Sequence, residues 1–439
     1  MSNAASGTWS NWGNTASCTP NRLIVPQNVD ELAADVAAAA ERGDVVKPVG
    51  AGHSFSEIAI APGIQVSMAG FKGVRSFDPE TKRITLGAGT NLHQIPGILD
   101  PLGLAMINLG DVDRQTVSGA TSTGTHGTGG QFGGISTQIR GVTLVDGTGK
   151  VRTIGENDPE LKAAALGLGA LGILTEITLQ VTDAYAIEAI EAPGDADETI
   201  DNFLENVANV DHYEFYWFPH TTCTLTKTNT RLPASTPASG PGKVRRYIDD
   251  ELLSNDLLRV LCTIGSKAPA LVPAISQLTG RGLSARRYVD RSDKIFISDR
   301  DVRFREMEYA VPLEAVPDAL REVRSMINRR KYKVSFPIEV RAAAADDLML
   351  STAHGRASGY IAVHRYHRDD VADSHAYFRD VEDIMMAHGG RPHWGKMHNR
   401  DAAYFESVYP KFNDFLAIRD KFDPNRTFAN PYLTQTLGK

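Results

Sequence analysis

Four short segments of the chain pair turn-forming glycine or proline with side chains that could bind a ligand. The first, 48–54, reads Pro-Val-Gly-Ala-Gly-His-Ser and follows an apolar stretch. Its two glycines permit a tight turn whose successive backbone N–H groups can hold a phosphate. It has neither the Lys-Ser/Thr pair of an ATP-binding P-loop nor the third glycine of the dinucleotide fingerprint. A bare structural turn fits this spacing equally well, although His53 is an unusual residue for one.

The second segment, 118–129, lies in the most glycine-rich part of the chain. Nine of the 39 glycines fall between Gly103 and Gly134, and here they alternate with Ser and Thr around His126. Small residues let a large ligand touch the backbone, and hydroxyls and amides then offer neutral donors. A flexible linker is the alternative, which the histidine and the flanking strand-like segments disfavour.

The third and fourth segments could provide charge near a substrate. On a strand, Glu339 and Arg341 of the segment 336–341 project from one face, suited to binding hydroxyls and stabilising charge. The segment 391–396, Arg-Pro-His-Trp-Gly-Lys, offers a rigid aromatic wall in Trp394 and a movable cation in Lys396. A structural ion pair and a buried aromatic turn are the simpler explanations of each segment alone. Together, the four segments predict a large phosphate-bearing cofactor and a polar substrate.

Histidines raise the question of a metal centre, because seven of the 12 lie between His354 and His398. His364 and His367 have the i,i+3 spacing of ligands on a helix, but they would face opposite sides of the strand predicted there. No nearby carboxylate pattern completes a site. We therefore predict no metal.

Composition narrows the class of protein. The 439 residues carry a net charge of −7, which disfavours non-specific nucleic-acid binding. No apolar run is long enough to span a bilayer, and the first residues lack the features of a secretory signal. Three scattered cysteines argue against a disulfide framework, so a cytoplasmic location is the expectation.

Hydrophobic periodicity predicts an α/β-like beginning and a more mixed α+β second half, with a boundary near 182–190. A loop is predicted at 231–243, and a hairpin turn at 146–149. The predicted strands are 45–49, 84–86, 142–145, 151–154, 173–181, 213–218, 334–341 and 359–367, and the predicted helices are 28–43, 197–210, 313–330 and 373–388.

The four segments, in this order, resemble those of FAD-linked oxidases of the vanillyl-alcohol-oxidase type, and within them the aldonolactone and alditol oxidase group. The resemblance extends from about Thr19 to Gly438. It implies an α+β fold with a two-subdomain FAD-binding domain and an α+β cap domain built on a large mixed or antiparallel sheet. The implied boundaries are 15–185 for the FAD-binding domain, 186–390 for the substrate (cap) domain and 391–439 for a C-terminal segment that returns to the FAD domain.

The resemblance also implies how FAD is held. In the family, the histidine of the Gly-x-Gly-His-Ser turn is linked to the 8α-methyl of the isoalloxazine, which makes His53 the covalent ligand. A second, cysteinyl link has no candidate, because no cysteine lies between Cys18 and Cys223. The other implied FAD contacts are Pro48, Val49, Gly50, Ala51, Gly52, Ser54, Gly110, Asp111, Thr116, Gly119, Thr123, Gly124, Thr125, His126, Gly172, Ile173, Leu174 and Lys396.

The catalytic residues implied are Glu339, Arg341, Lys396 and His364. His364 and Asp111 stand where alditol oxidases carry threonine and serine, and Phe-Pro-Ile before Glu339 resembles the lactone-oxidising branch. The implied reaction removes hydride from C2 of a sugar 1,4-lactone, such as L-gulono-1,4-lactone, to FAD and gives a 2-keto lactone that enolises to an ascorbate-type product. His364 and Lys396 both remain candidates for the base.

Oxygen is the expected acceptor of the electrons, with hydrogen peroxide as product, because Gly110 would leave room beside the flavin. The expected partners are therefore a small sugar lactone and O2, with no nucleic acid and no membrane span. An alditol or sugar oxidase of the same fold and a lactone dehydrogenase with another acceptor are the near alternatives. A non-catalytic nucleotide- or sugar-binding protein and a cell-wall flavin reductase are the more distant ones.

Overall fold

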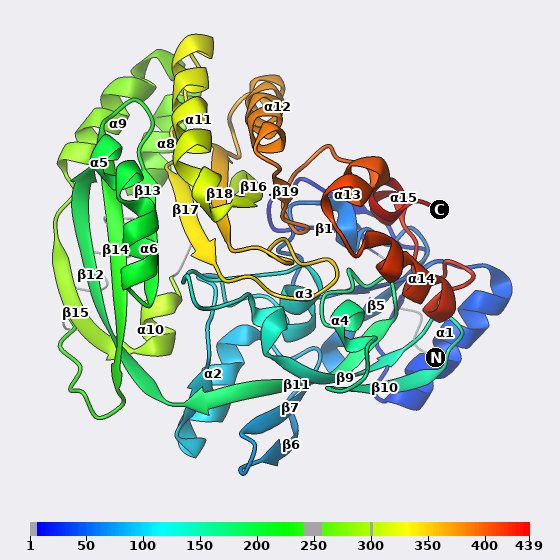
Figure 1. Ribbon diagram of the computed structural model, residues 1–439. Coiled ribbons are helices and arrows are strands. Elements are labelled where there is room, and N and C mark those ends of the chain that lie inside the picture. The colour runs from blue at the N-terminus through cyan, green and yellow to red at the C-terminus, as the bar shows by residue number, and fades with distance from the viewer. Residues whose placement is uncertain (1–6, 241–256, 299–301) are drawn as a thin grey trace.

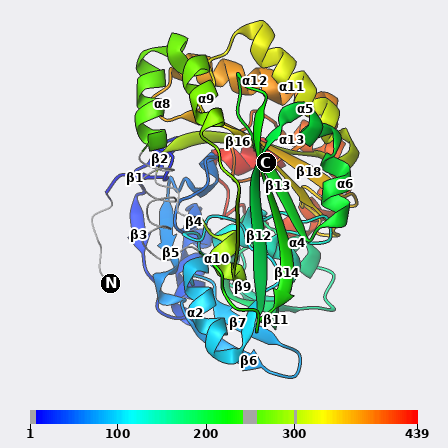
Figure 2. The same ribbon diagram turned by 90° about the vertical axis from the view of Figure 1, so that its left-hand side faces the viewer.

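The computed structural model describes residues 7–240, 257–298 and 302–439. Figure 1 shows blue and cyan N-terminal strands on one side, a large green-to-yellow sheet with its helices on the other, and red C-terminal helices packed back against the blue part. In Figures 1 and 2 the two parts meet where β11 ends and β12 begins. No helix in the described ranges is long and apolar enough to cross a bilayer.

The N-terminal part contains a small parallel sheet and a larger antiparallel one. The parallel sheet has the order β3-β5-β4, and the larger sheet has the order β10-β9-β11-β7-β6 with β8 on β11. Asn28 caps the first helix by accepting from Glu31 N at 2.9 Å, and Gly43, with φ +70°, ends it. The elements are β1 Trp9–Ser10, β2 Ser17–Cys18, β3 Arg22–Ile24, α1 Val29–Arg42, β4 Val46–Val49, β5 Ile64–Ser67, β6 Val74–Asp78, β7 Arg83–Gly87, α2 Ile95–Leu99, β8 Leu104–Met106, α3 Val117–Ser122, β9 Ile139–Val145, β10 Val151–Gly155, α4 Leu161–Ala164 and β11 Ile173–Asp183.

The second part is an eight-stranded antiparallel sheet in the order β15-β12-β14-β13-β17-β18-β16-β19. Helices cover one face of it. The elements are β12 Tyr185–Asp195, α5 Ala196–Asp201, α6 Phe203–Asn209, β13 His212–Trp217, β14 Cys223–Pro233, α8 Leu257–Lys267, α9 Val272–Arg281, β15 Arg286–Arg291, α10 Ser292–Phe296, β16 Phe304–Pro312, α11 Val316–Arg330, β17 Ile338–Ala343, β18 Ser358–Tyr366, α12 Val371–Ala387 and β19 Arg391–Pro392.

Side chains alternate sharply across the central strands of this sheet. Ile338 and Val340 of β17 are fully buried in the apolar cluster under the helices, as are Met307 of β16 and Phe215 of β13. The residues between them on each strand are carboxylates, arginine, tyrosine and histidine, which point to the other face. One face of the sheet therefore packs into the hydrophobic core, and the opposite face bears the polar and charged side chains.

The C-terminal segment crosses back to the N-terminal part. Phe55 N donates to Gly395 O at 2.6 Å, and Val46 N donates to Thr427 O at 2.8 Å. The side-chain amide of Asn430 donates to the carbonyls that follow the His53 turn. The helices of this segment are α13 Ala402–Val408, α14 Phe412–Phe422 and α15 Pro431–Leu437.

Most predicted elements are present within a few residues, and three differ. The helix predicted at 197–210 is two helices, because Asn202 leaves helical geometry with ψ near 5°. The strand predicted at 334–341 begins at Ile338, directly after Pro337, which has no N–H for the sheet. The loop predicted at 231–243 is still strand to Pro233, and its residues 241–243 lie outside the described ranges.

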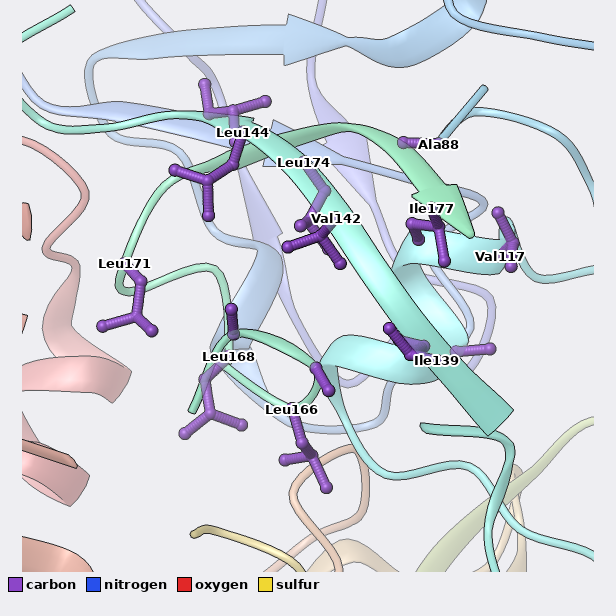
Figure 3. Close-up of a cluster of buried hydrophobic side chains, with 14 of the residues drawn as sticks. Ala88, Val117, Ile139, Val142, Leu144, Leu166, Leu168, Leu171, Leu174 and Ile177 are labelled. Carbon is purple, nitrogen blue, oxygen red and sulfur yellow. The ribbon is translucent and has the colours of Figure 1, made fainter. Parts of the chain in front are cut away.

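Elements that the periodicity did not predict include α3, β12 and β16. The short helix α3 lies inside the glycine-rich segment, where its composition resembles a loop. Figure 3 shows why it forms: Val117 of α3 lies among buried side chains of β9 and β11, such as Ile139 and Ile177. Tertiary burial thus outweighs the weak helix propensity of Ser, Gly and Thr.

Candidate active site

The two parts of the molecule enclose a cavity of about 400 Å³ beside the His53 turn. A narrower cavity of about 100 Å³ adjoins it and shares His53, Ser54, Gln115 and Thr123 as lining residues. The larger one is in the size range of small-molecule sites. Its lining includes the predicted residues His53, Ser54, Asp111, Thr123, Thr125, His126, Glu339, Arg341, His364 and Lys396.

Half of the residues that line the narrower cavity belong to the predicted turn and to the glycine-rich segment. Its lining includes Pro48, Gly50, Ala51, Gly52, His53, Ser54, Thr116, Gly119, Thr123, Gly172 and Leu174. No Asp or Glu of the described ranges lines it, and Lys47 does. Burial and the positive charge of Arg419 lower the pKa of Lys47 to about 7, while Asp423 has a smaller raising effect. Backbone N–H groups and a lysine side chain, with no acid, suit the diphosphate and adenosine half of FAD.

Close packing explains why this wall needs glycine. A Cβ on Gly50 would lie 2.6 Å from Thr116 Oγ1. That same hydroxyl accepts from Gly119 N at 3.1 Å and begins α3. The two glycine-bearing segments therefore touch each other at the wall where the cofactor would lie.

Four predicted cofactor residues do not line either cavity: Val49, Gly110, Gly124 and Ile173. Val49 and Ile173 are buried on strands whose alternate residues face the cavity. A Cβ on Gly110 would meet His126 O at 2.9 Å, so this glycine permits two backbone segments to approach. The structure thus shows a packing role for Gly110.

His53 is a half-buried histidine of the site, and no hydrogen bond joins its ring nitrogens to any residue that the structure describes. In contrast, His126, His364 and His393 each have a ring nitrogen bonded to a backbone group. Burial, followed by the positive charges of Lys396 and Arg114, lowers the pKa of His53 to about 4. Its ring is therefore neutral at ordinary pH, with a nitrogen lone pair available for bonding.

Arg341 lies at the centre of a buried ion cluster on the sheet. Its guanidinium contacts Glu339 on the same strand, Glu214 Oε2 at 3.0 Å and Asp111 Oδ1 at 3.3 Å. Tyr216 Oη donates to Glu339 Oε1 at 2.6 Å. Burial would lower the pKa of Arg341, but the three carboxylates raise it well above its ordinary value. The predicted Glu–Arg pair is thus part of a larger cluster that holds a permanent cation at the cavity wall.

Lys396 pairs with a carboxylate that the sequence analysis did not find. Its Nζ lies 2.5 Å from Glu306 Oε2, and the other oxygen of Glu306 lies 3.5 Å from His364 Nε2. Burial opposes the charge of Lys396, yet Glu306 and Glu308 raise its pKa above the ordinary value. The ion pair and the raised pKa therefore favour the ammonium form of Lys396, which has no lone pair to accept a proton.

His364 lies between two hydrogen-bond acceptors. Its Nδ1 lies 3.1 Å from the carbonyl oxygen of Pro337, and its Nε2 faces the carboxylate of Glu306. These two neighbours fix the orientation of the ring at the cavity wall. The carboxylate of Glu306 stays ionised between its partners: burial would raise its pKa, but Lys396 and His364 lower it to about 2.

A second buried carboxylate, Glu308, organises two more histidines. Its Oε1 lies 3.2 Å from His126 Nε2, and His126 Nδ1 lies 2.8 Å from Gly127 O. His393 accepts from Gly395 N through Nδ1, and burial, opposed by Glu308, lowers the pKa of His393 to about 4. The glycine-rich segment is thereby joined to β16 and to the C-terminal segment in one hydrogen-bonded network.

Two groups of buried side chains have possible metal-ligand atoms within 4.8 Å of one another. They are His126, Glu308 and His393 in one group, and Glu306, Glu339 and His364 in the other. The histidine spacing did not predict either group. Glu306 and Glu339 already contact Lys396 and Arg341, and Glu308 contacts His126. In the second group, both carboxylates are thus already paired with cations.

A signal for the missed residues does exist in the sequence. Glu306 and Glu308 alternate with apolar residues in Phe304–Pro312, and Glu214 and Tyr216 do so in His212–Trp217. Polar residues at every second position indicate one polar face of a strand. The pattern alone does not say whether that face meets solvent or a cavity.

Comparison with known proteins decides the family. An FAD binding domain model matches residues 20–155, and the D-arabinono-1,4-lactone oxidase model matches residues 177–436. The chain belongs to the D-arabinono-1,4-lactone oxidase family. It is 39% identical to the L-gulono-1,4-lactone dehydrogenase of Mycobacterium tuberculosis over 98% of this chain and 99% of the relative. It is 33% identical to the L-gulonolactone oxidase of Bos taurus over 97% of each chain.

As a member of this family, the protein is an FAD-dependent aldonolactone oxidoreductase, which confirms the prediction from the four motifs. Solved structures confirm the predicted fold class. A solvent-stable cholesterol oxidase superposes with a TM-score of 0.83 over 99% of this chain and 98% of the other, at 17% identity. The cholesterol oxidase of B. sterolicum superposes with a TM-score of 0.81 over 98% and 96%, at 18% identity. At such identities the likeness concerns the fold alone.

Proposed function

We propose that this enzyme oxidises the C2 hydroxyl of a sugar 1,4-lactone, such as L-gulono-1,4-lactone, to the 2-keto lactone, which enolises to an ascorbate-type product. The observation that carries the proposal is the cavity beside His53, where fixed cations and carboxylates line a space of small-sugar size. The named activities of the relatives support a lactone as the substrate. FAD, when bound, supplies the two-electron acceptor.

The residues of the cavity have separable roles in this proposal. Negative charge develops near the cofactor and the forming carbonyl, where Arg341 and Lys396 are held as permanent cations. Glu339, fixed by Tyr216 and Arg341, orients substrate hydroxyls. Because an alcohol that has lost hydride is a strong acid, an ionised carboxylate such as Glu306 is basic enough to take its proton.

A substrate panel tests the proposal. We expect L-gulono-1,4-lactone and related five-membered lactones to bleach the flavin absorbance of the anaerobic enzyme, with the corresponding alditols and free aldonic acids ineffective. Activity on xylitol or sorbitol that exceeds activity on every lactone would contradict it and establish the alditol oxidase alternative.

The electron acceptor is tested separately. We propose oxygen, with hydrogen peroxide as product, while the name of the mycobacterial relative favours another acceptor. Flavin reduced by lactone under nitrogen is mixed with air-saturated buffer or with an artificial dye, and its reoxidation is followed. Reoxidation by oxygen within the turnover time supports the oxidase; reoxidation only by the dye supports a dehydrogenase.

We also propose a single covalent bond between His53 and the 8α carbon of FAD. Acid precipitation should leave yellow colour in the wild-type pellet, and His53→Ala should release all flavin into the supernatant. Because the pKa of His53 is about 4, attachment should keep its rate from pH 9 down to pH 5 and slow below pH 4. Flavin that leaves the wild-type protein on denaturation would contradict the covalent bond.

For the organisation of the chain we keep the predicted division into 15–185, 186–390 and 391–439 as a proposal. The passage from the smaller sheet to the eight-stranded sheet at residue 184 supports the first boundary. The return of the segment after 391 to the His53 turn supports the second. Limited proteolysis with and without FAD would test both.

A further inference from the structure

We propose that Trp12, held in an N-terminal hairpin, positions His53 for its covalent attachment to FAD. The hairpin consists of β1, β2 and the turn between them, residues 9–18, and it lies outside the matched FAD binding domain, which begins at residue 20. The inference rests on the covalent bond proposed above. It adds an element that the motifs did not include.

Hydrogen bonds fix the hairpin to the backbone of the His53 turn. Trp12 N donates to Gly52 O at 2.8 Å, and the side-chain amide of Asn11 donates to Ser54 O at 2.8 Å. These two acceptors are the carbonyls on either side of His53. Asn11 is itself only 3% exposed, and its oxygen accepts from the backbone of its own hairpin. The turn is therefore fixed from one side by a buried amide.

The Trp12 indole fixes the ring of His53. The two rings are stacked, with centroids 5.7 Å apart and planes 20° apart. Phe304 of β16 and Phe55 meet the indole edge-on, with centroids at 5.3 and 6.0 Å. Trp12 thus connects the histidine to the eight-stranded sheet, and both rings line the large cavity.

Stacking on Trp12 orients the ring of His53, whereas hydrogen bonds orient the rings of the other histidines in the site. His126, His364 and His393 are oriented through a ring nitrogen. A nitrogen lone pair that accepts a hydrogen bond is not available to form a covalent bond with FAD. Stacking orients the ring by its face and leaves both nitrogens uncommitted, which is what attachment requires.

The step that this geometry serves joins a ring nitrogen of His53 to the 8α carbon of FAD. One C–H bond of the methyl group and the N–H bond of the imidazole are lost. The two protons and two electrons enter FAD, and dioxygen then removes them as hydrogen peroxide. The protein need only hold the neutral ring at the methyl group in bonding distance and direction.

The test compares Trp12→Ala and Trp12→Phe with the matched control Trp9→Ala. Trp9 belongs to the same hairpin and lies beside Gly52, and the structure shows no ring contact between it and His53. Each protein is purified as expressed, and total flavin is measured by absorbance. Covalent flavin is measured by fluorescence in denaturing gels, at once and during incubation with added FAD in air.

We expect Trp12→Ala to retain bound FAD but to attach it at least roughly tenfold more slowly than wild type, since misplacement by about 1 Å can cost 100-fold. Trp12→Phe, which keeps a stacking ring, should recover much of the rate, and Trp9→Ala should behave as wild type. Attachment by Trp12→Ala at the wild-type rate overturns the inference, as does an equal loss in Trp9→Ala. If the wild type holds no covalent flavin, the proposed His53–FAD bond itself is wrong. In that case His53→Ala and the wild type release the same amount of flavin, which distinguishes this outcome from a failure of the Trp12 proposal alone.

Discussion

Arg341→Met is expected to lower kcat/KM for the lactone by roughly 1,000-fold, which corresponds to about 4 kcal/mol of transition-state stabilisation. The guanidinium is buried among three carboxylates and stays charged, so its field is fixed before substrate arrives. Its removal also leaves those carboxylates uncompensated, which should cost about 3–5 kcal/mol of folding stability. Steady-state kinetics and urea denaturation measure the two effects.

Two further variants separate charge from packing at this position. Arg341→Lys keeps the cation but cannot contact the carboxylates with a planar fork, so we expect partial recovery of stability and less of kcat. Glu214→Gln weakens the cluster at a residue that does not line the cavity, and it should reduce kcat/KM far less than Arg341→Met. Equal losses in Glu214→Gln and Arg341→Met would mean that Arg341 is structural only.

Lys396→Met is expected to lower kcat by roughly 100- to 1,000-fold, as the loss of one preorganised charge does in other sites. Glu306 and Glu308 would then face the cavity without the ammonium that now neutralises them. The remaining negative charge opposes the charge that develops during oxidation. The flavin reduction potential should therefore fall as well, and spectroelectrochemistry measures it independently of turnover.

The pH dependence gives a further check on Lys396. Its pKa in the folded protein lies above the ordinary value, so the stability that it contributes is fully present below about pH 10. That stability is lost only as the pH rises through the folded value. We therefore expect no fall of kcat from this group between pH 7 and 10, and Lys396→Arg should retain the same profile. A kcat that rises with pH through about 8, and a rise that disappears in Lys396→Met, would instead show that Lys396 acts as the base.

The residues that the sequence could predict are those in compact motifs. The His53 turn and the Glu339–Arg341 pair are recognisable because their neighbours constrain the backbone, and the structure places both on one cavity. The sequence analysis did not predict Glu214, Glu306 and Glu308. Each belongs to a strand whose alternating polar pattern is the same whether the polar face meets solvent or a cavity. Only the pairing of β13, β17, β18 and β16 in one sheet brings these carboxylates beside Arg341 and Lys396.

The limits for the fold have the same origin. Helix α1 follows from Asn28, Glu31 and Gly43, which act within a few residues of one another. Helix α3 depends on burial of Val117 between distant strands, so its Ser-Gly-Ala-Thr composition pointed to a loop. The role of the hairpin at residues 9–18 was likewise hidden, because its partners at Gly52 and Ser54 are reached only in three dimensions.

The return of the chain to Phe55 and Val46 has a consequence for biosynthesis. The turn that holds His53 leaves the ribosome early, but its hydrogen-bond partners Gly395, Thr427 and Asn430 are made some 340 to 380 residues later. Until these residues are made, the N-terminal part of the chain lacks the hydrogen bonds that they provide. The last part of the chain is therefore needed to complete the surroundings of the turn, and we expect chains that stop before residue 395 to bind flavin poorly.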